Sequence, residues 1–151
     1  MKWWAFAIAV FVLFSLLPSP GTELGQLHPV SLLLVQNEDN MVRLTTDTQE
    51  TGAGEHLAAA IRKLEETTTG HLFLETVENL VIEEDAQYLL PELRRQLRPD
   101  VRVCCPEGTL DMEEMSAYLN SHSPALRLEN ALPGKRLPAL RVVEGRYLLE
   151  D

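Results

Sequence analysis

The sequence predicts a single mixed α/β (α+β) domain in which three main helices pack on a β-sheet, preceded by an N-terminal hydrophobic segment. Strand-length apolar runs alternate with stretches whose apolar residues recur at helical spacing, which favours one sheet with helices on its faces. Of the 151 residues, a leader of roughly 20 to 25 would leave enough chain for one core. We expect residues 1–21 to be a signal peptide or N-terminal membrane anchor, and residues 22–151 to be the domain.

The leader begins with a positive charge at Lys2 and continues as an apolar stretch of 15 residues from Trp3 to Leu17. A helix of that length spans about 22 Å, short of the ~30 Å hydrocarbon core, which favours a signal peptide over a full membrane span. Two prolines at Pro18 and Pro20 make a poor cleavage site, so release and retention as a short anchor both stay open. Residues 1–30 contain no cysteine, which excludes lipoprotein-type acylation there. Either outcome predicts an exported protein, secreted or held on the extracytoplasmic face of a membrane.

Charge excludes one class of partner. The segment after Lys2 holds 12 of the 13 basic residues and all 23 acidic ones, so its formal charge is 12 − 23 = −11. A surface this acidic is repelled by phosphate backbones, and we therefore expect no nucleic-acid partner.

The first half of the domain predicts a hairpin followed by a helix. Val30–Gln36 is apolar and of strand length, and Met41–Thr46 alternates with period two after a turn cluster at 37–40. Residues 47–54 are polar with two glycines, which predicts a loop. From Glu55 to Glu66 the apolar residues recur at i, i+3, i+4 and i+7, as in an amphipathic helix.

The second half predicts two more helices and further short strands. Pro91 lies inside a helical pattern from Glu84 to Leu97, where it should kink the helix or split it in two. The remaining elements are a helix at Leu110–Leu119, an irregular stretch at Ser121–Lys135, and strands at Leu72–Leu74, Asn79–Ile82, Val101–Cys105, Leu137–Val143 and Tyr147–Leu149.

The two cysteines, Cys104 and Cys105, are adjacent in an apolar run. Neighbouring cysteines cannot link distant parts of a fold and lack the C-x-x-C spacing of redox or zinc sites. We expect two small hydrophobic side chains in a buried strand, where burial raises the thiol pKa and makes the thiol unreactive.

Candidate catalytic and ligand-binding groups form no recognisable constellation. Gly52-Ala53-Gly54 lacks the lysine and the glycine spacing of a phosphate-binding loop, so a plain loop is expected. Glu83-Glu84-Asp85 is better explained by helix capping and the helix dipole than by acid–base chemistry. Ser121-His122-Ser123 has no orienting carboxylate to nominate.

The histidines, moreover, lack the spacing of a zinc site. The sequence therefore predicts no catalytic, cofactor-binding or metal-binding residues, and a protein that is not an enzyme. The four histidines are His28, His56, His71 and His122.

Several short motifs occur in a suggestive order. Gly54 opens the helix that runs to Glu65; a strand leads into Glu83-Glu84-Asp85-Ala86 at a helix start; and Arg98 and Arg102 flank the approach to the next strand. In this order, from Val30 to Leu119, the chain resembles the N-terminal domain of the Ger(x)C family, the C subunit of bacterial spore germination receptors. A fainter similarity extends to Leu137–Leu140.

The resemblance implies a non-enzymatic, membrane-apposed subunit that helps other proteins respond to nutrient germinants, with germination receptor-type permease subunits as partners at the spore inner membrane. Family members are typically lipoproteins with further domains. The resemblance thus implies a single-domain relative or a truncated form, in which residues 3–17 provide the membrane contact. The family has no known catalytic residues, so none are carried over.

A second function stays open: a secreted small-ligand-binding or hydrolase domain whose site no motif reveals. A protein-contact domain should expose an apolar patch or an open sheet edge. A ligand-binding domain should instead have a concave pocket with converging polar groups and a perturbed pKa.

Overall fold

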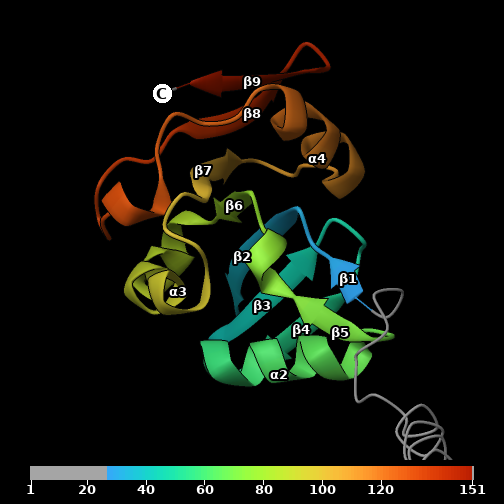
Figure 1. The fold of residues 1–151 in the computed structure, drawn as a ribbon. Coiled ribbons are helices and arrows are strands. Elements are labelled where there is room, and N and C mark those ends of the chain that lie inside the picture. Colours follow the sequence, from blue (N-terminus) through green and yellow to red (C-terminus); the bar gives the residue numbers. More distant parts are fainter. Residues whose placement is uncertain (1–26, 151) are drawn as a thin grey trace, which may run out of the picture.

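The structure, a computed structural model, describes residues 27–150 (Figure 1). The predicted leader at residues 1–21 and its cleavage site lie outside the described residues. The domain is α+β, with a mixed seven-stranded sheet and three α-helices, which confirms the predicted fold class. None of the helices within residues 27–150 has the length and apolarity needed to cross a membrane.

The main sheet is parallel at its centre and antiparallel at both ends. In spatial order the strands are β4 (Thr51–Gly54), β3 (Met41–Thr46), β2 (Leu32–Glu38), β6 (Asn79–Ile82), β7 (Arg102–Glu107), β8 (Ala139–Val143) and β9 (Arg146–Glu150). The four central strands, β2, β6, β7 and β8, are parallel to one another. Strands β3 and β4 are added antiparallel on one side, and β9 is added antiparallel on the other.

Two-residue turns join the antiparallel hairpins β2–β3 and β8–β9. Asp39 and Asn40 have φ angles of 50° and 63°, and Glu144 and Gly145 have φ angles of 50° and 75°. Two successive left-handed residues give the turn whose twist matches that of paired strands, and Asn, Asp and Gly are the residues that adopt this conformation most easily. The turn predicted at 37–40 is confirmed at Asp39 and Asn40, whereas Asn37 and Glu38 belong to β2 and pair with β3.

The helices cover both faces of the sheet (Figure 1). The helices α2 (Leu57–Thr67) and α3 (Leu90–Gln96) bury Leu64 and Leu93 in the larger core on one face. On the other face, α4 (Met112–Ser121) buries Met115 and Leu119 in a smaller core against Cys104 of β7. Shorter elements are the strand pair β1 (Leu27–Pro29) and β5 (His71–Phe73), and the 3-10 helices η2 (Leu74–Thr76), η3 (Glu84–Leu89) and η4 (Leu128–Asn130).

A proline and an aspartate mark the starts of α3 and α4. Pro91 lies in the first turn of α3, where its missing N–H leaves no intrahelical bond unmade, and the predicted 84–97 helix is split into η3 and α3. Asp111 caps α4, because its Oδ1 accepts from the backbone N–H groups of Glu113 and Glu114 at 3.0 Å.

The loop predicted at 47–54 was wrong in its second half, which forms strand β4. Gly52 and Gly54 face α2, and a Cβ on Gly52 would lie 2.4 Å from the carbonyl oxygen of Ala60. These glycines permit the helix backbone to lie against the strand, so their role is close approach and not loop flexibility.

Strand β6 has the predicted bounds, Asn79–Ile82, and the other remaining predicted strands are present with shifted boundaries. The strand expected at 72–74 is β5, which pairs in parallel with β1 outside the main sheet.

Candidate functional site

A pocket of about 560 Å³ lies beyond the carboxyl ends of β6 and β7, between η3 and the segment that enters β8. Ligands in open α/β sheets commonly bind at the carboxyl ends of parallel strands. Carboxylates and cations both line this pocket, which we call the η3 pocket. The charged lining residues are Glu84, Asp85, Glu107, Lys135 and Arg136.

Helix α3 positions the far wall of the η3 pocket. The guanidinium of Arg94 donates through Nε to the carbonyl oxygen of Leu128 at 2.9 Å and through Nη2 to that of Ala131. These bonds hold η4 against α3 and set the course of residues 133–137, which carry Lys135 and Arg136 to the pocket. The sequence predicted only an irregular stretch here, because a long-range bond from Arg94 leaves no local signal.

Cys105 lies on the wall of the η3 pocket and is half-buried. Burial raises the pKa of its thiol, and the negative charges of Glu84 and Glu107 raise the pKa further. The thiol is therefore protonated at neutral pH and is a weak nucleophile. Full burial was predicted for both cysteines: this is confirmed for Cys104, whose thiol pKa is raised to about 12 by burial, and wrong for Cys105.

A smaller pocket of about 280 Å³ opens on the opposite face, between β2 and the turn that precedes α4. Glu83 lines it and accepts a hydrogen bond at 2.8 Å from the side-chain Nε2 of Gln36. Glu83 makes no side-chain capping bond to η3, so the capping role predicted for it was wrong. Glu84 and Asp85 do lie in the first turn of η3, as expected.

The side chains of Ser121 and His122 both point back to the backbone of α4 and not toward each other. Ser121 Oγ donates to the carbonyl oxygen of Ala117 at 3.5 Å, and His122 Nδ1 lies 3.3 Å from the carbonyl oxygen of Tyr118. The imidazole of His122 also stacks on the ring of Tyr118, with centroids 4.5 Å apart. Across residues 27–150, no group of three or more metal-ligating side chains is found.

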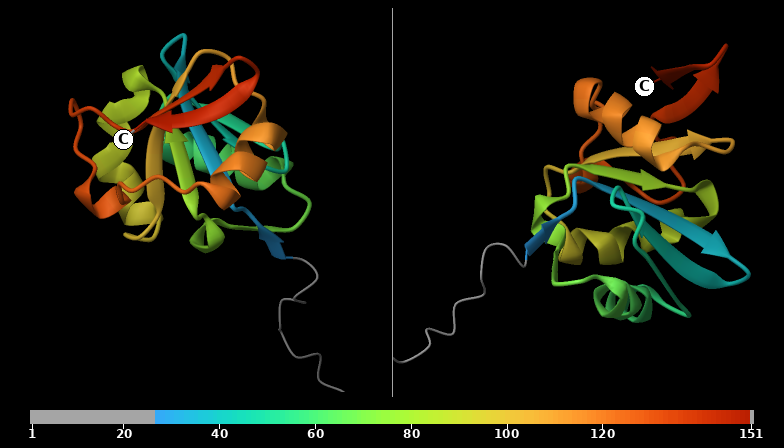
Figure 2. Two further views of the ribbon diagram at one scale, coloured as in Figure 1. Left: turned by 90° about the horizontal axis from the view of Figure 1, so that it is seen from above. Right: turned by 90° about the vertical axis from the view of Figure 1, so that its right-hand side faces the viewer.

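The β8–β9 hairpin, at the outer end of the sheet (Figure 2), carries three exposed large apolar residues. Because side chains alternate along a strand and Leu148 pairs with Arg141, Val143 and Leu148 lie on one face of the hairpin and Val142 lies on the other. Val142 is 44% exposed, Val143 is 43% exposed and Leu148 is 41% exposed. We call these three residues the hairpin patch. Val143 and Leu148, side by side on one face, form a small exposed apolar cluster, which is typical of a protein contact surface, whereas single exposed apolar residues are common everywhere.

Tyr147 bonds the hairpin to the start of α4, and Leu140 and Leu149 pack in the same small core as Met115 and Leu119. The ring of Tyr147 stacks on Tyr118, with centroids 5.6 Å apart. The Tyr147 hydroxyl accepts from the backbone N–H of Asp111 at 3.2 Å and lies 3.3 Å from the Asp111 carbonyl oxygen, to which it can donate. The patch therefore stands on an ordered support.

Arg141 organises the charges beside the patch. Its guanidinium makes an ion pair with Glu150 on β9 and lies 4.0 Å from the carboxylate of Glu107 on β7. Val143 and Leu148 therefore lie on the same side of the sheet as Glu107, which lines the η3 pocket.

Comparison with protein-family models, curated proteins and solved structures finds no match for this chain.

Proposed function

We propose that this chain is an exported or membrane-tethered accessory domain that works through protein–protein contacts, and is not an enzyme. One observation carries this proposal: Val142, Val143 and Leu148 are exposed on the outermost hairpin of the sheet, with Val143 and Leu148 on one face and Val142 on the other, and Tyr147 bonds the hairpin to Asp111. The order of sequence motifs that resembles the Ger(x)C family supports a sharper form, in which the partner is a germination receptor-type permease subunit.

The first test is to co-purify the chain with that partner. The full-length chain would be expressed with the multi-pass permease subunits of its own organism, and the retained permease would be quantified. Val142→Lys together with Val143→Lys should reduce the retained permease by about tenfold or more, since charges in an apolar contact must be desolvated on binding.

The matched control is Met41→Lys, which adds the same charge at an exposed apolar residue at the other end of the sheet. This variant should retain the permease as well as the wild type does. Equal retention by all three proteins, or retention by none, would count against the proposed contact.

The germination role and the tethering are separable. Deleting the gene in a spore-forming host should slow nutrient-triggered germination, and the Val142→Lys, Val143→Lys chain should fail to restore it. Finding the gene in an organism that never sporulates would contradict the germination role.

The tethering has its own test. High-salt washing of a membrane fraction should leave the intact chain bound, and release of the chain would contradict tethering through residues 3–17.

A second candidate function, binding of a small ligand, is favoured by the η3 pocket. Its volume of about 560 Å³ lies within the usual range for small-molecule sites, and Glu84 faces the same space as Arg136. Simple zwitterions are suitable probes because they carry both charges. A rise in thermal midpoint with a zwitterion, abolished by Arg136→Ala but unaffected by the two hairpin substitutions, would favour this reading.

A further inference from the structure

The outer edge of β9 is open. Within residues 27–150, β9 pairs only with β8 and ends the sheet, so one row of its backbone N–H and C=O groups has no strand partner (Figure 1). Proteins usually block such an edge, because it can accept another strand. The edge strand reads Arg-Tyr-Leu-Leu-Glu from residue 146 to residue 150.

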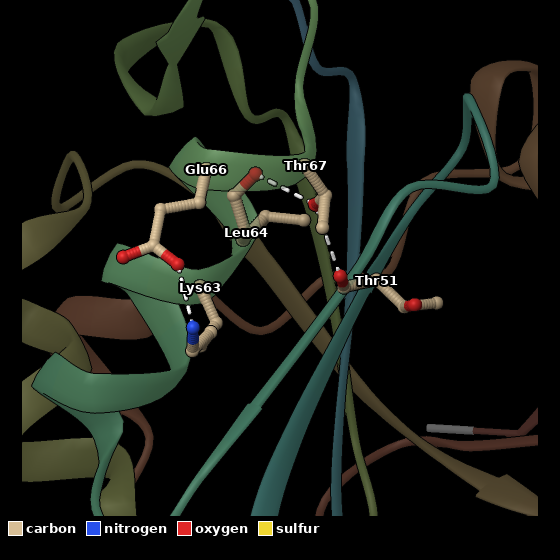
Figure 3. Close-up of polar contacts among 5 residues, drawn as sticks. All are labelled: Thr51, Lys63, Leu64, Glu66 and Thr67. Atoms are coloured by element: carbon tan, nitrogen blue, oxygen red, sulfur yellow. Dashed lines mark hydrogen bonds and ion pairs between the residues drawn. The ribbon is translucent and has the colours of Figure 1, made fainter.

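The opposite edge of the sheet is shorter and partly covered. Strand β4 has four residues, and the Thr67 hydroxyl of α2 donates to the carbonyl oxygen of Thr51 at 3.1 Å (Figure 3). Strand addition is therefore less favoured at β4 than at β9.

The charge pattern of β9 is complementary to itself. When two antiparallel copies of β9 are centred on Leu148, Arg146 of each copy lies opposite Glu150 of the other, and Leu148 lies opposite Leu148. Residues 146, 148 and 150 share one face of the strand, and the twofold axis of such a pair preserves that face. Opposite charges at paired positions stabilise antiparallel strands, while like charges destabilise them.

Antiparallel β9 pairs centred on any other residue of the strand have less favourable contacts. A pair centred on Arg146 or on Glu150 places like charges directly opposite each other. A pair centred on Tyr147 places Glu144 against Glu150, and one centred on Leu149 places Leu148 against Glu150. Only the centre at Leu148 forms two attractive pairs and one apolar contact.

Electrostatics also selects this end of the molecule for contact between two copies. The chain after Lys2 carries a formal charge of −11, which makes two copies repel over most of their surfaces. Residues 139–151 instead contain two arginines, two glutamates and one aspartate, a formal charge of −1. Two domains therefore approach through β9 with little opposing net charge.

We infer that the chain forms a twofold-symmetric dimer by antiparallel pairing of β9 with β9 of a second copy, centred on Leu148, which joins the two sheets into one. Five residue pairs cover less than the interfaces of about 1,200–2,000 Å² found in stable complexes, so the dimer is weak. Val142 and Val143 lie on β8, behind the new edge, and remain accessible to another protein.

The test is sedimentation velocity of the full-length chain, in one detergent, from about 1 µM to about 1 mM, the range in which a weak dimer dissociates. The wild type should shift from monomer to dimer. Leu148→Lys places two ammonium groups opposite each other and should raise the dissociation constant by about tenfold or more. Val142→Lys is the matched control and should dimerise as the wild type does.

Charge reversal provides a test that does not depend on loss of function. Arg146→Glu alone and Glu150→Arg alone should each be monomeric, since each opposes like charges across the axis. An equimolar mixture should form heterodimers, because both cross pairs become attractive. Circular dichroism of each variant verifies folding.

A mixture no more dimeric than its components, or a Leu148→Lys chain that associates like the wild type, would overturn the inference. Failure of the dimer would leave the proposed permease contact untouched, because that contact is tested separately, by co-purification of the Val142→Lys, Val143→Lys chain.

Discussion

The β4 end of the sheet is packed tightly against α2, whereas the β9 end projects with its outer edge open (Figure 2). At the β4 end, Gly52 and Gly54 leave no room for a Cβ beneath the helix, and Leu64 is fully buried. At the β9 end, Val142, Val143 and Leu148 are exposed. The difference indicates that the first end stabilises the fold, while the second is the end at which we propose contacts with other chains.

The largest effect should come from filling the space at Gly52. A side chain there would place Cβ 2.4 Å from both the Ala60 carbonyl oxygen and the Leu64 nitrogen, and neither backbone atom can move without displacing α2. We expect Gly52→Val to lower the free energy of unfolding by about 3 kcal/mol or more, measured by urea denaturation. Ala53→Ser, on the other face of β4, should stay within about 0.5 kcal/mol. Similar losses for both variants would contradict the close-packing role of Gly52.

The same substitution at each end gives the next contrast. Leu64→Ala should cost about 3 kcal/mol, because it removes a fully buried side chain and leaves a cavity between α2 and the sheet. Leu148→Ala should cost less than about 1 kcal/mol, since 41% of the residue is exposed to solvent and little cavity is left. Chemical denaturation of the two variants is the measurement, and equal losses would show that the ends contribute equally to stability.

Cys104 lies on β7 between the two ends and makes stability depend on pH. Burial raises its thiol pKa from 9.0 to about 12. Between these values the unfolded chain has released a proton that the native state keeps, so stability falls as pH rises. The contribution is fully present below about pH 9 and declines by up to about 1.4 kcal/mol per pH unit above it.

Urea denaturation at several pH values above 8 should therefore give a steeper decline for the wild type than for Cys104→Ala. Cys105→Ala, at the half-buried neighbour, is the matched control and should flatten the decline less. Parallel curves for the wild type and Cys104→Ala would contradict burial of the Cys104 thiol.

The smallest effect concerns the contact that partly covers the β4 edge. The Thr67 hydroxyl lies 3.1 Å from the Thr51 carbonyl oxygen and 2.9 Å from the Leu64 carbonyl oxygen (Figure 3). Thr67→Val keeps the shape but removes these bonds, and should cost about 1 kcal/mol by thermal or urea unfolding. Thr67→Ser retains the hydroxyl and should recover most of that loss; a serine variant as unstable as the valine variant would attribute the effect to packing.

Much of the fold was predictable because it depends on local patterns. The alternation at 41–46, the spacing of Leu57, Ala60 and Leu64, and the proline at 91 each predict an element that the structure contains. Strand β4 was not predictable from Gly52 and Gly54, since glycine is equally typical of loops. Its pairing with β3 depends on the approach of α2, which is a tertiary contact.

The sequence predicted which types of functional surface to expect, but not where in the fold they lie. An open edge and a polar pocket were expected as alternatives, and the structure contains both, at β9 and at the η3 pocket. The pocket joins η3 to residues 133–137 through bonds from Arg94, some 34 to 37 positions away in the chain. Separations of that size leave no periodic signal in the sequence.

By itself, the sequence determined the acidic charge, the number and type of most elements, and the burial of Cys104, because these follow from side-chain chemistry and short-range spacing. Only the tertiary structure decided which strand ends the sheet, which glycines support a helix, and that Cys105 faces a pocket. Those features depend on the order in which distant segments pair, and strand order is set by packing over the whole core.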